Sequence, residues 1–122
     1  MVEVDGKRIF LSGPVTGIKD NNRREFEQTK ELLVDETNVD YVYDPVATWS
    51  DYGEAHGWTR EQYMQANLME LMRMRNVLVM EPWYDMVIQL PGWKESLGCV
   101  TEFWIALQIG IPCYERDEVM LW

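Results

Sequence analysis

The chain has 122 residues, of which 47% are hydrophobic and 26% charged. That length is enough for one domain with its own core, which we assign to residues 1–122. The formal net charge of −10 argues against a surface for duplex nucleic acid, which needs clustered lysines and arginines. The charge leaves three interpretations open: simple solubility, an acidic interaction module, or mimicry of nucleic acid.

No apolar run reaches the ~20 residues that a membrane span requires. The N-terminus, Met1–Asp5, has no basic stretch of the kind that opens a signal peptide. We therefore expect a cytoplasmic protein with no membrane partner.

The first half of the chain predicts two short strands around a helix. Arg8–Ser12 is typical of a buried strand and is closed by Gly13-Pro14. N-cap candidates at residues 20–22 open a helix that runs to about Asp35. Tyr41–Tyr43 is the second predicted strand, stopped by Asp44-Pro45.

Residues Val46 to Trp58 are predicted to form a long polar and aromatic loop, of the kind that serves as a lid or binding loop. Thr59 then caps a long helix that extends to near Val77, although residues 76–80 could instead form a strand. The methionines of this helix are typical of a core or a subunit interface (Met64, Met69, Met72, Met74).

A third strand over Met86–Leu90, a helix over Leu97–Ile109 and a last strand over Ile111–Tyr114 complete the pattern. Strands that alternate with helices predict an α/β, single-domain, flavodoxin- or Rossmann-like three-layer fold with a small parallel sheet. Such folds bind ligands at the carboxyl ends of their strands. Ser12-Gly13-Pro14, Asp44-Pro45 and the segment from Pro91 to Glu102 follow predicted strands and should converge there.

Glu102 is the most unusual residue in that segment. It shares a helical stripe with Ile105, Ala106 and Ile109, so it should face the core. A buried carboxylate is costly unless it is hydrogen-bonded, paired or facing a cavity. The alternatives are a glutamate that reaches solvent and one that is stabilised only by the helix dipole.

Two turns could bind a phosphate. Ser12-Gly13 follows the first strand but lacks the known Gly-rich phosphate motifs. Ser96 and Gly98 stand at the start of the later helix, where unpaired N–H groups and the helix dipole suit an anion. Alternatively, Ser96 is only a helix cap.

Asp85 precedes the third strand and could pair with Glu102, with Glu81 as an alternative acid. Two carboxylates in different environments are the usual equipment for breaking a glycosidic bond. The single histidine, His56, lies in a polar loop and leaves no Ser-His-Asp or Cys-His grouping. Cys99 and Cys113 lack metal-site spacing, so we expect buried thiols, no metal and no cofactor.

Two motifs carry a resemblance to a known family. The first half contributes Ile9-Phe10-Leu11-Ser12-Gly13-Pro14, Thr16-Gly17, Asn22-Arg23, Phe26, Asp44-Pro45 and Tyr63-Met64. The second contributes Asp85, Leu90-Pro91-Gly92-Trp93, Ser96-Leu97-Gly98, Glu102 and Ala106. Together they resemble the DUF4406 group, which is similar to the nucleoside 2-deoxyribosyltransferase and nucleoside 5′-monophosphate N-glycosidase superfamily.

The resemblance implies a flavodoxin-like fold and a nucleotide site. It implies that Glu102 attacks C1′ of the sugar and that Asp85 assists the departing base. Ser96 stands where deoxyribosyltransferases carry an aspartate, which resembles the 5′-monophosphate N-glycosidase branch. The substrate-binding residues it implies are Ser12, Gly13, Pro14, Asn22, Arg23, Trp93, Ser96 and Gly98.

The expected function is therefore hydrolysis of, or deoxyribosyl transfer from, a nucleoside 5′-monophosphate. The alternatives are a nucleotide-binding or sequestering protein without turnover and an acidic interaction module. The superfamily commonly forms dimers or larger assemblies, so the resemblance also implies a homo-oligomer. The methionine-rich helix and the apolar end Met120-Leu121-Trp122 are compatible interface surfaces.

Overall fold

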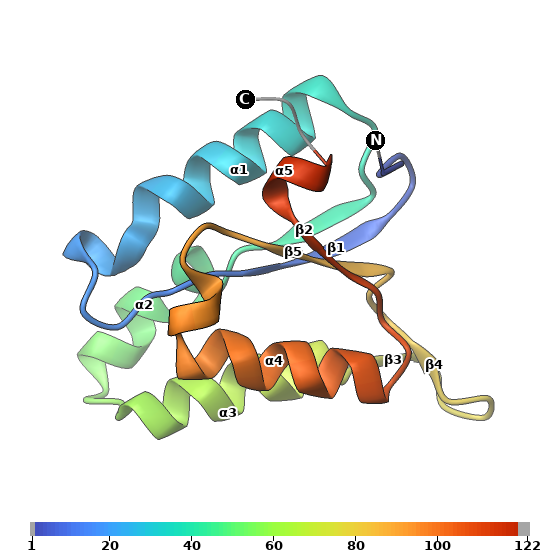
Figure 1. The fold of residues 1–122 in the computed structure, drawn as a ribbon. Coiled ribbons are helices and arrows are strands. Elements are labelled where there is room, and N and C mark those ends of the chain that lie inside the picture. The colour runs from blue at the N-terminus through green and yellow to red at the C-terminus, as the bar shows by residue number, and fades with distance from the viewer. Residues whose placement is uncertain (1, 120–122) are drawn as a thin grey trace.

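A computed structural model describes residues 2–119 and contains a four-stranded parallel sheet between two layers of helices (Figure 1). The strand order is β2-β1-β5-β6, with every neighbouring pair parallel. The strands are β1 (Arg8–Ser12), β2 (Tyr41–Tyr43), β5 (Met86–Gln89) and β6 (Cys113–Glu115). When only the four strands of this sheet are numbered in chain order, the order is 2-1-3-4, which matches the first four strands of the flavodoxin order. The predicted α/β fold is confirmed.

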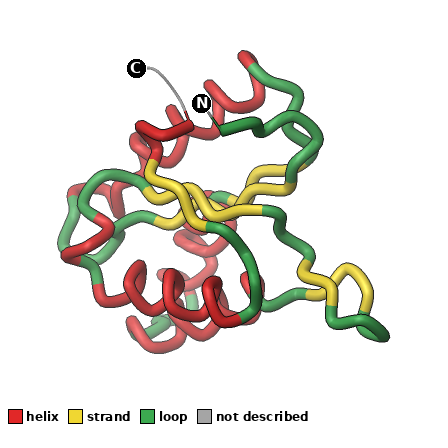
Figure 2. The backbone as a smooth tube through the Cα atoms, turned by 45° about the vertical axis from the view of Figure 1, so that its right-hand side comes forward, coloured by secondary structure: helices red, strands yellow, loops and turns green. Residues whose placement is uncertain are grey.

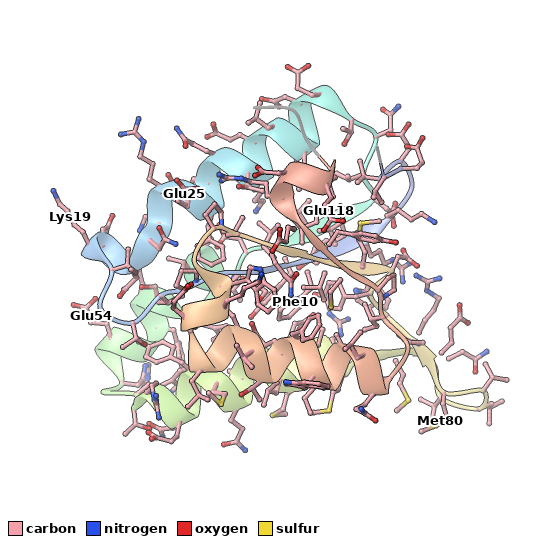
Figure 3. The ribbon with its side chains drawn as sticks, viewed as in Figure 1. Phe10, Lys19, Glu25, Glu54, Met80 and Glu118 are labelled. Atoms are coloured by element: carbon pink, nitrogen blue, oxygen red, sulfur yellow. The ribbon has the colours of Figure 1, made fainter. Side chains whose placement is uncertain are left out.

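The two faces of the sheet are covered by different helices. Helices α1 (Arg23–Glu36) and α5 (Arg116–Val119) lie on one face, and α3 (Arg60–Leu71) and α4 (Leu97–Gln108) lie on the other (Figures 1 and 2). Successive β1 side chains alternate between the two cores, as the pleat of a strand requires. Ile9 belongs to the α1 core, whereas Phe10 belongs to the α4 core and points into it (Figure 3).

The predicted loop from Val46 to Trp58 is wrong, because most of it is helix α2 (Pro45–Ala55). Asp44 is its N-cap: the carboxylate accepts hydrogen bonds from the N–H groups of Val46 (3.0 Å) and Ala47 (3.1 Å). Pro45 occupies the first helical position, where its missing N–H costs nothing. Asp-Pro therefore ends β2 and also starts a helix.

The predicted long helix ends sooner than expected. Thr59 and Gln62 form the capping box that opens α3, but α3 stops at Leu71. The chain then forms an antiparallel hairpin of β3 (Met74–Asn76) and β4 (Glu81–Pro82), which projects from the body of the molecule (Figure 2). The strand alternative for residues 76–80 is also only partly right, because 77–80 form the turn at the tip.

Two short 3₁₀ helices, η1 (Lys19–Asn22) and η2 (Trp93–Glu95), precede α1 and α4. None of the helices within residues 2–119 has both the length and the apolar character needed to cross a membrane. The apolar end Met120–Trp122 lies outside the described residues.

Candidate functional site

A serine and a glutamate from distant parts of the chain meet at the carboxyl edge of the sheet. Ser12 is the last residue of β1, and Glu102 lies in the second turn of α4. The Ser12 hydroxyl donates a hydrogen bond of 2.6 Å to Glu102 Oε1. The side chain of Glu102 is only 7% exposed, so it does not reach out into solvent. The inward-facing position predicted from the helical stripe is confirmed.

Burial controls the protonation of Glu102. Removal from water disfavours the charged form and raises the pKa of this carboxyl from 4.5 to about 7, while the Ser12 hydroxyl lowers it in part. Both the carboxylate and the carboxylic acid are therefore present near neutral pH. A carboxyl with such a pKa inside a cavity is typical of catalytic positions.

The cavity above Glu102 has a volume of about 370 Å³, within the range of small-molecule sites. The sheet edge contributes Gly13, and the first turns of α3 and α4 contribute Arg60, Ser96 and Gly98. Among the described residues, Glu102 is the only acid that lines it. The cavity therefore combines one carboxylate with the amino ends of three helices, α2, α3 and α4.

Ser96 both caps α4 and lines this cavity. Its hydroxyl accepts a 3.3 Å hydrogen bond from the N–H of Cys99, so the cap interpretation is correct. The N–H groups of Leu97 and Gly98, in the first turn, have no partner within a helix and can serve a ligand. A Cβ on Gly98 would lie 3.9 Å from Met64 Cε and from Ser96 Oγ, so larger side chains there would occupy the cavity.

Gly13 has a packing role as well as a place in the lining. A Cβ at this position would come within 2.9 Å of Leu90 Cδ1 and 3.0 Å of Phe26 Cζ. The first distance is shorter than real Cβ contacts and the second is tighter than most of them, so a larger residue here would have to displace Leu90 or Phe26. The Ser12-Gly13 turn thus depends on its glycine for contact between elements.

Five predicted binding residues are not in the lining of the cavity: Ser12, which is buried against Glu102, and Pro14, Asn22, Arg23 and Trp93. Asn22 Nδ2 donates to the carbonyl of Pro14 (2.9 Å), which ties the loop after β1 to the start of α1. Arg23 forms ion pairs with Asp51 (3.4 Å) and with Asp20. Trp93 Nε1 donates to Glu115 at 3.1 Å, in a separate depression beside β6.

Asp85 is not brought together with Glu102. It immediately precedes β5, whereas Ser12, the partner of Glu102, is in register with Gln89 at the other end of that strand. Four residues of extended chain separate the two ends by roughly 13 Å. The Asp85 carboxylate instead accepts from the N–H of Arg8 (2.8 Å) and forms an ion pair with Arg75 (3.3 Å). The alternative acid, Glu81, lies in the hairpin and also pairs with Arg75.

Several polar residues of the cavity were missed by the sequence reasoning, among them Arg60 and Asn67. Arg60 opens α3, and its guanidinium forms an exposed ion pair of 3.7 Å with Glu61. Asn67 Oδ1 accepts a 2.6 Å hydrogen bond from the Tyr43 hydroxyl, which leaves the NH₂ group of Asn67 as a donor for a ligand. The capping box at Thr59 locates the start of α3, but no local signal shows that this end faces Glu102.

The thiol of Cys99 lines the same cavity but does not suit nucleophilic attack. Burial, with the nearby Glu102, raises its pKa to about 11, so it is protonated at neutral pH. Cys99 and Cys113 are both free; Cys99 is buried as expected, whereas Cys113 is only partly buried. Within the described part of the chain, no three His, Cys, Asp or Glu side chains gather in a way that could hold a metal ion. Of this thiol and the Glu102 carboxyl, only the carboxyl is ionised to an appreciable degree near neutral pH.

A family described as a domain of unknown function (DUF4406) matches residues 7–114. The chain belongs to the DUF4406 family. No curated protein and no solved structure matches it. The match to this DUF4406 protein includes β1, α3 and α4, and therefore every residue that lines the cavity.

Proposed function

We propose that this DUF4406 protein cleaves the N-glycosidic bond of a nucleoside 5′-monophosphate, with Glu102 as the nucleophile. The observation that carries the proposal is the buried carboxylate of Glu102 at a cavity of nucleotide-binding size, close to the amino end of α4. The similarity of the motifs to the glycosidase superfamily supports the same reaction class. Hydrolysis and deoxyribosyl transfer share the first step.

In that step a Glu102 oxygen forms a bond to C1′ as the bond from C1′ to the base nitrogen breaks. The electron pair leaves with the base, and the transition state resembles an oxocarbenium ion. Water then attacks C1′ and releases the sugar phosphate and the Glu102 carboxylate. In transfer, a second base takes the place of water.

The phosphate would bind at the amino end of α4. The N–H groups of Leu97 and Gly98 and the helix dipole favour an anion there, and Arg60 adds a positive charge across the cavity. Arg60 replaces Arg23 in this role, because Arg23 is held by two aspartates. Binding energy from the phosphate would position C1′ over Glu102.

The departing base needs a proton, and Asp85 is too far away to give it. Since no second described acid lines the cavity, the proton would come from solvent that enters beside the base. This favours substrates whose base leaves easily. It also gives a second candidate function, a nucleotide-binding protein without turnover, which the separation of Asp85 from Glu102 favours.

A base-release assay tests the proposal. The protein is incubated with ribo- and deoxyribonucleoside 5′-monophosphates and with the matching nucleosides, and free base is measured by chromatography. We expect base release from the wild type. Glu102→Gln should abolish it, and Glu31→Gln, an exposed change on α1, should leave it intact. If calorimetry shows that the nucleotide binds but no free base is released at high protein concentration, the second candidate function is identified instead.

A further inference from the structure

Among the large exposed apolar side chains of the described residues, two groups lie on the β3–β4 hairpin and on α4. The turn of the β3–β4 hairpin consists of Val77, Leu78, Val79 and Met80, which are 65%, 94%, 68% and 68% exposed. We call these four residues the hairpin tip. Met80 lies at the far end of the hairpin, away from the helices and the sheet (Figure 3). A run of four exposed apolar residues is unusual for a surface that faces only water.

The outer face of α4 is the second element. Glu102 is the only charged residue of this helix, and it is buried. Leu97, Trp104 and Leu107 on the outward side are 59%, 58% and 45% exposed. We call these three residues the α4 outer face. An apolar helix face is normally covered, yet α4 packs against the sheet and α3 and leaves this face exposed.

We propose that the hairpin tip of one copy of this protein docks on the α4 outer face of a second copy, and that the exchange is reciprocal. The same chain carries both the projecting hairpin tip and the α4 outer face, which lacks charge. The β3–β4 hairpin points away from the body of its own chain and leaves the hairpin tip uncovered (Figure 2). Two-fold pairing lets the hairpin tip of each chain cover the α4 outer face of the other chain.

The net charge of the protein limits the surfaces through which two copies can pair. Two chains of net charge −10 repel each other over most orientations. The hairpin tip and the α4 outer face carry no charged side chain, so their contact places no like charges together. A two-fold pair forms each contact twice, and seven large side chains on each chain bring the buried area to the order of the 1,200 Å² that stable interfaces need.

The arginines beside the tip do not favour an anionic membrane as the occupant. Arg73 pairs with Glu70 at 2.8 Å, and Arg75 pairs with Glu81 and Asp85 at 3.3 Å. Their charge is therefore balanced within the protein. An acidic protein is also repelled by anionic lipid.

Sedimentation of the full-length chain tests the inference. The wild type is expected at about twice the chain mass of 14.5 kDa. Leu78→Asp and Trp104→Asp should each raise the dissociation constant at least about 30-fold, as loss of an interface hot spot does. Val34→Asp is the matched control, because Val34 is 54% exposed on α1, across the sheet, and should leave the dimer intact. Unchanged circular dichroism of each variant separates lost association from lost folding.

Mixing the two variants identifies the contact. A pair made of one Leu78→Asp chain and one Trp104→Asp chain keeps one intact tip against one intact α4 outer face. The mixture should therefore associate more tightly than either variant alone. A monomeric wild type, a dimer insensitive to Leu78→Asp, no gain on mixing, or tip-dependent binding to lipid vesicles by a monomer would each overturn the inference. None of these readouts depends on the proposed catalytic activity.

Discussion

Substitution of Glu102 by glutamine should remove a pH-dependent loss of stability from this protein. The pKa of Glu102 is about 7 in the folded chain, because the side chain is buried, and near its ordinary 4.5 in the unfolded chain. Below pH 4.5 the group is protonated in both states and costs nothing. Between pH 4.5 and 7 the unfolded chain releases the proton while the folded chain retains it, so stability falls as pH rises.

A gap of this size between the two pKa values corresponds to about 3 kcal/mol, reached above pH 7 and constant from there. That is a large fraction of the ~5–15 kcal/mol that stabilises a typical domain. Glutamine is nearly the same size, does not ionise, and can still accept the hydrogen bond from Ser12 through its amide oxygen. The Glu102→Gln protein should therefore gain about 3 kcal/mol over the wild type between pH 4.5 and 7.5.

Urea unfolding followed by tryptophan fluorescence, at several pH values from 4.5 to 8, measures this difference directly. The comparison between wild type and variant cancels the titration of the other groups. Glu31→Gln, an exposed change on α1, serves as the control and should give a flat difference curve. A flat curve for Glu102→Gln as well would mean that burial does not destabilise the carboxylate, contrary to this prediction.

Three further outcomes follow from the site. If base release occurs, kcat/KM should rise with pH and level off above about 7, because the ionised form of Glu102 attacks C1′. Ser12→Ala should move that rise to higher pH, since the serine hydroxyl lowers the pKa of Glu102, and pH–rate profiles of both proteins check this. Arg60→Ala should raise KM for a nucleoside 5′-monophosphate about tenfold or more, as loss of an exposed phosphate contact does, and should leave KM for the nucleoside unchanged. The control Arg24→Ala, on α1, should change neither KM value. Equal effects of Arg60→Ala on both substrates would remove Arg60 from the phosphate site. Gly13→Ala should lower the free energy of unfolding by about 1–3 kcal/mol, because the added Cβ crowds Leu90 and Phe26. Urea unfolding measures this change, and an unchanged midpoint would show that the end of β1 can shift to accept a Cβ.

Local signals in the sequence were enough to predict most elements of the fold. β1 and β2 were predicted with their observed bounds, because short apolar runs closed by Gly-Pro or Asp-Pro have few other solutions. The same local logic placed Glu102 on the buried stripe of α4 and Ser96 at its cap. Helix α2 was missed, because Asp44-Pro45 was interpreted only as the end of a strand.

The composition of the site depended on the order of the strands and the packing of the helices. Ser12 and Glu102 are 90 residues apart and meet because β1 and α4 share the carboxyl edge of the sheet. Asp85 was in the predicted site because the family resemblance implied a second carboxylate there, although a residue that precedes a parallel strand lies at the opposite edge.

Local sequence patterns were therefore enough to locate β1 and β2, the residue that caps α4, and the carboxylate that faces inward. Packing alone brings Arg60 and Asn67 of α3 to the cavity with Glu102, and burial brings the pKa of this carboxyl to about 7. The difference arises because periodicity and capping act within a few residues of chain. Cavities and desolvation arise from segments that are brought together only when the sheet and its helices pack.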